Sequence, residues 1–206
     1  MAWDTEETRR RLKEAAIAEF GERGPETTMA AIAHRAGINK ERLYNYFGDK
    51  RALFGAVLAD QLQQLAASVG EPEGGLADIG EFAGRTFDYH HEHPELVRLL
   101  LWEALSQGAP ADEMNRGTHY QEKVARLVAA QRDGSLTKEI DADYAVFMII
   151  ALAAWWVAVP QLARMLTGAN GSNPAERARR RAAVVRAVER IMLPAGREVA
   201  DRQIQP

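Results

Sequence analysis

The stretch Thr27–Lys50 decides the fold, and it reads TTMAAIAHRAGINKERLYNYFGDK. Apolar residues recur at helical spacing in its first half, where Met29 and Ile32 begin one buried face. Gly37 interrupts this pattern, and Asn39 is a residue type that caps the N-terminus of a new helix. The stretch therefore predicts two short helices joined by a tight turn, which is a helix-turn-helix.

The rest of the chain also follows helical periodicity, and no segment alternates apolar and polar residues strictly enough to predict a strand. Clusters of glycine and proline separate the segments. The expected helices are Thr5–Arg23, a short one from Thr27-Thr28 to Gly37, Lys40–Tyr46, Lys50–Ser68, Leu76–His91, Pro94–Ser106, Asp112–Arg132, Asp143–Thr167 and Pro174–Leu193. We predict an all-α fold of about nine helices, with a three-helix helix-turn-helix domain at the N-terminus.

Composition excludes several classes of protein. The chain has 206 residues, of which 47% are hydrophobic, so it can bury a sizeable core. It contains no cysteine, which excludes disulfides, thiolate metal sites and cysteine nucleophiles. The net charge is −3, yet residues 28–58 carry five basic and only two acidic side chains. A basic segment on an acidic chain is compatible with local contact to phosphates.

The sequence gives no reason to expect a membrane protein. The N-terminus lacks the apolar core of a signal peptide. The longest apolar run, Ala145–Val159, has fifteen residues and ends at Pro160, whereas a spanning helix needs about 20. We expect a buried helix there and a cytoplasmic protein with no membrane partner.

The residues around the helix-turn-helix resemble the DNA-binding domain of the tetracycline-repressor (TetR) family. The resemblance covers about the first 58 residues and rests on Phe20, Gly24, Thr27, Thr28, Ile32, Ala33, Ala36, Gly37, Ile38, Asn39, Leu43, Tyr44, Tyr46, Phe47, Lys50 and Leu53. It implies a transcriptional regulator, expected to be a repressor, that binds double-stranded operator DNA as a homodimer and is released by a small-molecule effector. The alternative is a regulator without such an effector, either an activator or one switched by a protein partner.

The resemblance assigns DNA contacts to the second and third helices and to the start of the fourth. The expected DNA-binding residues are Thr28, Asn39, Lys40, Arg42, Tyr44, Asn45 and Lys50. Hydroxyl groups and lysines suit phosphate contact, and we assign that role to Thr28, Tyr44 and Lys50. Arg42 or Lys40 could read guanine, and Asn45 could read adenine. We expect Tyr46 to be half-buried instead.

Two departures from the family pattern concern the third helix. Asn39 stands where the family often has serine, and it caps a helix equally well. Glu41 stands where the family often has glycine, and a carboxylate near phosphates weakens DNA binding. Glu41 could face away, pair with Lys40 or Arg42, or accept a hydrogen bond from cytosine N4.

The resemblance also implies the domain plan: residues 1–58 bind DNA, 59–193 bind ligand and dimerise, and 194–206 form a flexible tail. In the family the last two large helices pair with their copies in a four-helix bundle, and Asp143–Thr167 and Pro174–Leu193 resemble them in position and character. The expected dimer residues are Ile149, Ala153, Trp156, Val157, Ala178, Ala182, Val185, Val188 and Met192. A monomer with a thick core is the alternative. The arginines at 177 and 179–181 are expected to form a solvated face.

Aromatic and methionine side chains suit an adaptable cavity for an apolar or amphipathic effector. The candidate lining residues are Phe82, Phe87, Trp102, Glu103, Met114, Tyr120, Met148 and Trp155. Packing of the domain's own core explains most of these positions equally well, and Glu103 could instead be exposed or pair with Arg98. Effector binding would shift the fourth helix, so that the two recognition helices no longer match half-sites one DNA turn apart.

An enzyme is not expected. The sequence has no phosphate-binding glycine loop, no dinucleotide fingerprint and no nucleophile elbow. The run His90-His91-Glu92-His93 is better explained as a polar helix end before Pro94 than as a metal site. We therefore expect no catalytic residue, no metal ligand and no cofactor.

Overall fold

A computed structural model describes residues 2–70, 78–106, 109–169 and 171–193. Within them lie ten α-helices and one 3-10 turn, and no strand, so the predicted all-α fold is confirmed. The elements are α1 (Ala2–Arg23), η1 (Gly24–Glu26), α2 (Met29–Ala36), α3 (Lys40–Phe47), α4 (Lys50–Val69), α5 (Ile79–Glu92), α6 (Pro94–Leu105), α7 (Glu113–Arg132), α8 (Ala142–Ala158), α9 (Pro160–Thr167) and α10 (Pro174–Met192). The expected tail at 194–206 and the first residues of the helix expected from Leu76 lie outside the described residues.

The helices form two compact units that do not follow chain order. One unit comprises residues 1–68 together with Tyr89–Arg116, and the other comprises Val69–Asp88 together with the chain from Gly117 onward. The first unit therefore contains α1–α4 and also α6. The DNA-binding domain expected from the sequence, residues 1–58, does not include α6, whereas this unit does.

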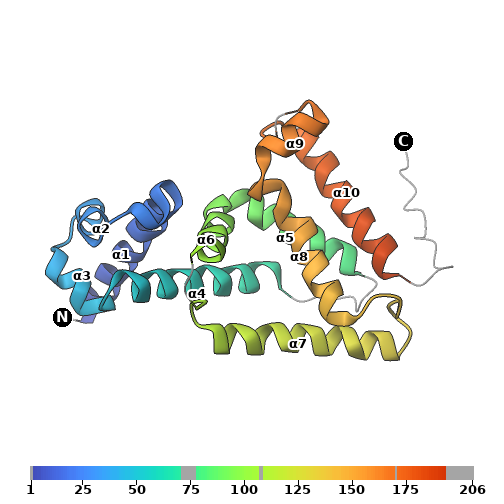
Figure 1. Ribbon diagram of the computed structural model, residues 1–206, viewed down its shortest axis with the longest axis horizontal. Coiled ribbons are helices and arrows are strands. Elements are labelled where there is room, and N and C mark those ends of the chain that lie inside the picture. Colours follow the sequence, from blue (N-terminus) through green and yellow to red (C-terminus); the bar gives the residue numbers. More distant parts are fainter. Residues whose placement is uncertain (1, 71–77, 107–108, 170, 194–206) are drawn as a thin grey trace. The chain divides into compact units, whose positions relative to one another are not determined.

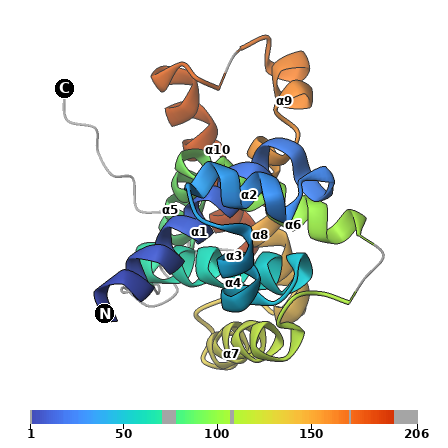
Figure 2. The same cartoon turned by 90° about the vertical axis from the view of Figure 1, so that its left-hand side faces the viewer.

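The N-terminal unit is built around α1. Figures 1 and 2 show α2 and α3 lying together next to α1, and α1 also contacts α6. Leu12, Phe20, Ile32, Leu43 and Leu53 are all buried and come from α1, α2, α3 and α4. Their helical spacing is what turns each apolar stripe toward one shared core. This core fixes α3 relative to α1 and α2.

The second unit has its own core. Phe87 from α5, Leu127 from α7, Ala153 from α8 and Val188 from α10 all belong to one buried cluster. Phe87 has no solvent-exposed surface. One apolar side of α8 and of α10 thus packs into the core of this unit, and its side chains do not contribute to the predicted dimer surface.

The expected helix Asp143–Thr167 is wrong in one respect, because it is two helices. α8 ends at Ala158, α9 begins at Pro160, and the axes bend by 84°. Proline lacks an N–H donor and its ring clashes with the carbonyl four residues earlier, so an unbroken helix cannot continue through Pro160. Within the described residues no single helix is long and apolar enough to cross a membrane, and only this bent pair reaches the required length and composition.

Gly24 allows the backbone after α1 to lie directly against the Trp102 ring of α6. Gly24 has a φ of +57°, and a Cβ atom there would lie 2.4 Å from Cε2 of the Trp102 ring. Any side chain at this position would therefore combine backbone strain with a steric clash. The contact with Trp102 therefore requires glycine at position 24, where α1 ends and η1 begins.

Replacing Gly24 with alanine is expected to lower the free energy of unfolding by about 2 kcal/mol, measured by urea denaturation. Gly168→Ala is the matched control, because Gly168 has a φ of +67° and nothing within 4 Å of the added Cβ. The control introduces the strain without the clash and should lose about 1 kcal/mol. Equal losses in the two variants would contradict the role given to Trp102.

Candidate nucleic-acid interface

The turn between α2 and α3 has the geometry of a glycine-terminated helix. Gly37 adopts the left-handed conformation with φ 65° and ψ 34°. The N–H of Ile38 donates to the carbonyl of Ala33 at 3.0 Å, which closes the end of α2. Arg11 of α1 donates to the carbonyl of Ala36 at 2.7 Å. This turn therefore sets the angle between α2 and α3, and α1 holds it in place.

Both short helices begin with a side-chain cap. The Thr28 hydroxyl accepts a hydrogen bond from the N–H of Ala31 at 3.1 Å at the start of α2. The Asn39 amide oxygen accepts from the N–H of Glu41 at 2.8 Å at the start of α3. Thr28 and Asn39 are both exposed. Thr28 and Asn39 thus each stand at a helix N-terminus, where the helix dipole favours an anion such as phosphate.

The outward face of α3 carries most of the predicted contacts. Lys40, Glu41, Tyr44 and Asn45 are exposed, at spacings that place them on one side of the helix. The Lys40 ammonium lies 5.7 Å from the centre of the Tyr44 ring. Leu43 on the opposite side is fully buried. The helix is therefore anchored by one face and leaves the other open to a partner.

Glu41 belongs to the open face. It lies one helical turn before Asn45, so the two side chains share one side of α3. This position is compatible with acceptance of a hydrogen bond from a cytosine amino group.

Arg42 and Tyr46 flank this face and are half-buried. The Tyr46 ring packs at 6.3 Å, centre to centre, from that of Phe47. Tyr46 is thus half-buried against its own unit, as the sequence predicted. Arg42 lies at the edge of the exposed face, from which a long side chain can still extend.

Lys50 is held against the start of α2. Its ammonium donates to the carbonyl of Pro25 at 2.7 Å and to that of Thr27 at 3.2 Å. An ammonium has three donors, so two carbonyls leave capacity for one more acceptor. The contact places a positive charge directly before Thr28, at the end of α2 that already favours anions. Lys50 and Thr28, 22 positions apart in sequence, form one local site.

A buried carboxylate that the sequence did not single out anchors α2. Glu19 of α1 is 3% exposed, and it accepts from the Thr27 hydroxyl at 2.7 Å and from Nε of Arg35 at 2.9 Å. Arg35 also donates to both carboxylate oxygens of Glu22, and these bonds raise the pKa of its guanidinium. Glu19 stands on the apolar stripe of its helix, and a charge in such a stripe is the signal that could have revealed this role.

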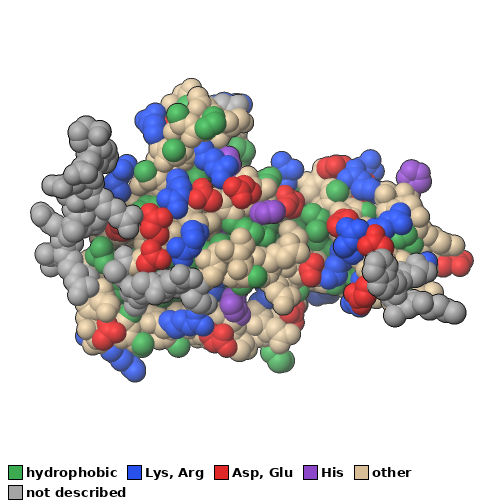
Figure 3. Space-filling view, turned by 180° about the vertical axis from the view of Figure 1, so that it is seen from behind, with side chains coloured by type: hydrophobic (Ala, Val, Ile, Leu, Met, Phe, Trp, Pro, Cys, Tyr) green, Lys and Arg blue, Asp and Glu red, His purple; other side chains and the backbone are tan. Residues whose placement is uncertain are grey.

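The arginines of α10 do not form a basic patch. Arg181 pairs with Asp88 at 2.7 Å and Glu81 at 2.9 Å, and these partners raise its pKa. Arg180 pairs with the buried Glu176 at 2.9 Å. Figure 3 shows acidic and basic side chains next to one another on one face of the molecule. Arg180 is only 5% exposed, so the expected solvated face is wrong for this residue, and charge pairing accounts for the run.

The predicted effector residues are divided between the two units. Trp102, Glu103 and Met114 belong to the N-terminal unit, and the other five belong to the second unit. Phe87 is fully buried in the core, whereas Met114 is 84% exposed and Trp155 is 55% exposed. The Glu103 carboxylate pairs with Arg116 at 2.8 Å rather than with Arg98. Trp102 and Glu103 line a cavity of the N-terminal unit, described below.

The predicted dimer residues are also divided. Ile149, Ala153, Val185, Val188 and Met192 are buried within their own subunit, so they offer no surface to a second copy. Trp156, Val157 and Ala182 are half-buried and Ala178 is exposed. The exposed side of α8 instead carries four large apolar side chains at helical spacing: Tyr144, Phe147, Met148 and Trp155.

The histidines at the end of α5 differ in how deeply they are buried. His90 is 2% exposed, and its Nδ1 has no hydrogen-bond partner among the described residues. Burial lowers the pKa of His90 to about 4. His93 stacks on Tyr89 with ring centres 4.3 Å apart. Across the part of the chain that the structure describes, no three His, Asp or Glu side chains are grouped as a metal site.

Two family models match this chain. Residues 12–57 match the bacterial regulatory proteins of the tetR family, and residues 78–190 match the tetracyclin repressor-like C-terminal domain. The chain belongs to the TetR family of transcriptional regulators. The first match contains α2, the turn and α3, so these elements form the helix-turn-helix of the matched tetR-family domain.

Curated relatives agree with this assignment. The regulator is 40% identical over 171 residues to the HTH-type transcriptional repressor SCO4008 of Streptomyces coelicolor, covering 81% of this chain and 87% of the relative. It is 31% identical over 160 residues to the HTH-type transcriptional regulator RutR of Escherichia coli, covering 74% of each.

Solved structures share the fold. SCO4942 from Streptomyces coelicolor has a TM-score of 0.75 at 31% identity, covering 90% of this chain and 98% of that one. TylP, a TetR regulator from Streptomyces fradiae, has a TM-score of 0.64 at 26% identity, covering 93% and 89%. The fold and the family assignment thus agree along most of the chain.

Proposed function

We propose that this TetR-family regulator is a cytoplasmic repressor that binds operator DNA through α3 and the start of α2, and that a small apolar or amphipathic molecule releases it. The observation that carries the proposal is the open face of α3, with Lys40, Tyr44 and Asn45 exposed over a buried Leu43. The name of the SCO4008 relative as a repressor supports the sign of regulation.

The proposed roles follow from position. Lys50 and Thr28 hold one phosphate at the N-terminus of α2, and Tyr44 binds a second. Arg42 and Asn45 read base edges in the major groove. Asn39 positions α3 through its cap, and Glu41 either weakens phosphate contact or selects a cytosine.

Two copies of the regulator would bind two half-sites. We assign the subunit contact to the exposed side of α8, because Phe147 is 72% exposed and Tyr144 is 61% exposed. Exposed aromatic side chains on one helix face are unfavourable in water and favour burial against a partner. Phe147→Glu should therefore give a monomer by light scattering, whereas Glu122→Gln, an exposed substitution on α7, should leave the dimer intact. A Phe147→Glu variant that remains dimeric would remove α8 from the contact.

Fluorescence anisotropy distinguishes residues that contact bases from residues that contact phosphates. Binding is measured to a duplex from upstream of the regulator's own gene and to a scrambled duplex of equal length. Arg42→Ala should weaken specific binding roughly 10–100-fold and scrambled binding much less, because it removes a base contact. Lys50→Ala should weaken both and reduce the slope against salt by about one, because it removes a phosphate contact. Equal losses on both duplexes for Arg42→Ala would contradict base reading by this residue.

A further inference from the structure

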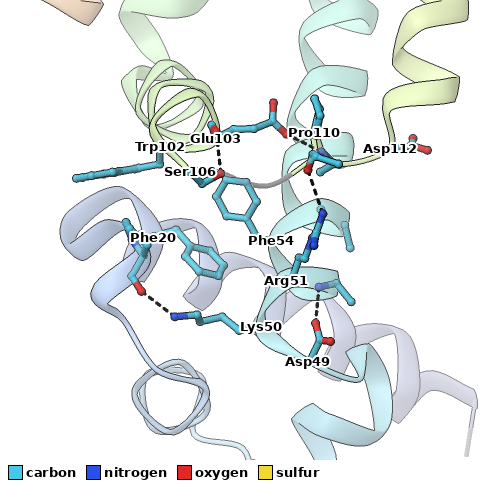
Figure 4. A pocket seen from close by; sticks show the side chains of 16 residues that line it. Phe20, Asp49, Lys50, Arg51, Phe54, Trp102, Glu103, Ser106, Pro110 and Asp112 are labelled. Atoms are coloured by element: carbon cyan, nitrogen blue, oxygen red, sulfur yellow. Dashed lines mark hydrogen bonds between the residues drawn. The ribbon is translucent and has the colours of Figure 1, made fainter.

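The N-terminal unit contains a cavity of about 670 Å³. Phe20 of α1, Phe54 of α4 and Trp102 of α6 contribute to its wall, as Figure 4 shows. Phe54 and Trp102 are only half-buried, so part of each ring remains uncovered. A volume of this size is within the range of sites that bind small molecules.

Its aromatic wall is fixed in place. The Phe20 and Phe54 rings pack edge to face with their centres 5.2 Å apart. Trp102 lies so close to Gly24 that a Cβ atom there would overlap its ring. These contacts hold each ring against a neighbouring group of the same unit. The cavity is therefore preformed, which lowers the entropic cost of binding a ligand.

The charged groups of the wall already make hydrogen bonds within the protein, and the Lys50 ammonium keeps capacity for one more acceptor. Lys50 donates to Pro25 and Thr27, Arg51 to Ala109, Asp49 accepts from Ala52, Glu103 from Arg116 and Ala111, and Asp112 from Asn115. A charged ligand would have to lose its water and compete with these existing bonds. A neutral ligand would meet aromatic and aliphatic surface without that penalty.

We propose that this cavity binds a neutral, planar aromatic molecule that stacks on Phe54 and Trp102. The chemistry follows from uncovered rings, which favour stacking, and from wall charges that already have hydrogen-bond partners within the protein. That the occupant also serves as the effector rests on the proposed function, and it is suggested by position, since Lys50 lines the cavity and is also a proposed phosphate contact.

Isothermal titration of the full-length protein without DNA tests the site, with 2-naphthol as the neutral probe. The expected dissociation constant is on the order of 100 µM. The anion 2-naphthoate and the cation 2-naphthylmethylammonium have the same ring system and should bind at least tenfold more weakly. Ala56→Leu, which places a larger side chain in the wall, should weaken 2-naphthol binding at least tenfold. Ala67→Leu on the exposed far part of α4 is the matched control and should leave binding unchanged.

Absence of 2-naphthol binding at 1 mM, equal binding of the charged analogues, or unchanged binding to Ala56→Leu would each overturn the proposal. Thermal melts of both leucine variants check that the fold is intact. Because DNA is absent, a failure of DNA binding leaves this result unaffected. If 2-naphthol binds the cavity but does not change DNA affinity, the site stands and its assignment as the effector site falls.

Discussion

Glu19→Ala is expected to lower the free energy of unfolding by about 3 kcal/mol. The substitution leaves the buried Thr27 hydroxyl without its acceptor and removes the buried partner of Arg35. Removing one member of a buried ion pair costs about 3–5 kcal/mol, and the low end applies because Arg35 is one-third exposed. Urea denaturation at pH 7 measures this loss.

Glu22→Ala is the matched control, because Glu22 binds the same arginine through both carboxylate oxygens but is mostly exposed. Pairs of this kind contribute little to stability. The control should therefore unfold almost like the wild type. Glu19→Ala should also weaken DNA binding, since Glu19 holds both ends of α2. If the two variants lost the same stability, the anchoring role of Glu19 would be refuted.

Acidification is expected to destabilise the protein through His90. An unfolded chain protonates histidine near pH 6.5, whereas burial lowers the pKa of His90 to about 4 in the folded state. Between these values the unfolded state binds a proton that the folded state excludes, so stability falls as pH falls. The loss from this group should reach about 2 kcal/mol at pH 5 and about 3 kcal/mol below pH 4.

Urea denaturation of His90→Leu between pH 7.5 and pH 5 isolates this effect, because the variant cannot bind the proton. Its free energy of unfolding should change much less across that range than the wild-type value. His34→Gln replaces an exposed histidine of α2 and should keep the wild-type pH dependence. A His90→Leu variant with the wild-type slope would show that other groups cause the acid sensitivity.

Local signals made the helix-turn-helix predictable from sequence. Gly37 and Asn39 act through backbone conformation and capping, which depend on a few neighbouring residues. Pro160 is an equally local signal, and it marks both the end of an apolar run and a break between two helices. The separate α9 follows directly from the chemistry of proline.

Contacts between distant segments were not predictable in the same way. An apolar stripe has the same spacing whether it faces its own core or a second subunit, so the spacing of Ile149 and Val188 does not distinguish a core position from a dimer position. The sequence predicts Trp102 as an effector residue but not its contact with Gly24, because that contact joins positions 78 residues apart. Glu19 needed the positions of Thr27 and Arg35 before its buried charge had an explanation.

Selection of binding sites from a pool of random-sequence duplex DNA tests the central claim, which is sequence reading by the exposed face of α3. The wild type should enrich an inverted repeat whose half-sites lie about 34–36 Å apart, one turn of DNA. The enriched site should bind at least about 10³-fold more tightly than a scrambled duplex. A pool that shows no enriched sequence after repeated rounds would contradict the claim.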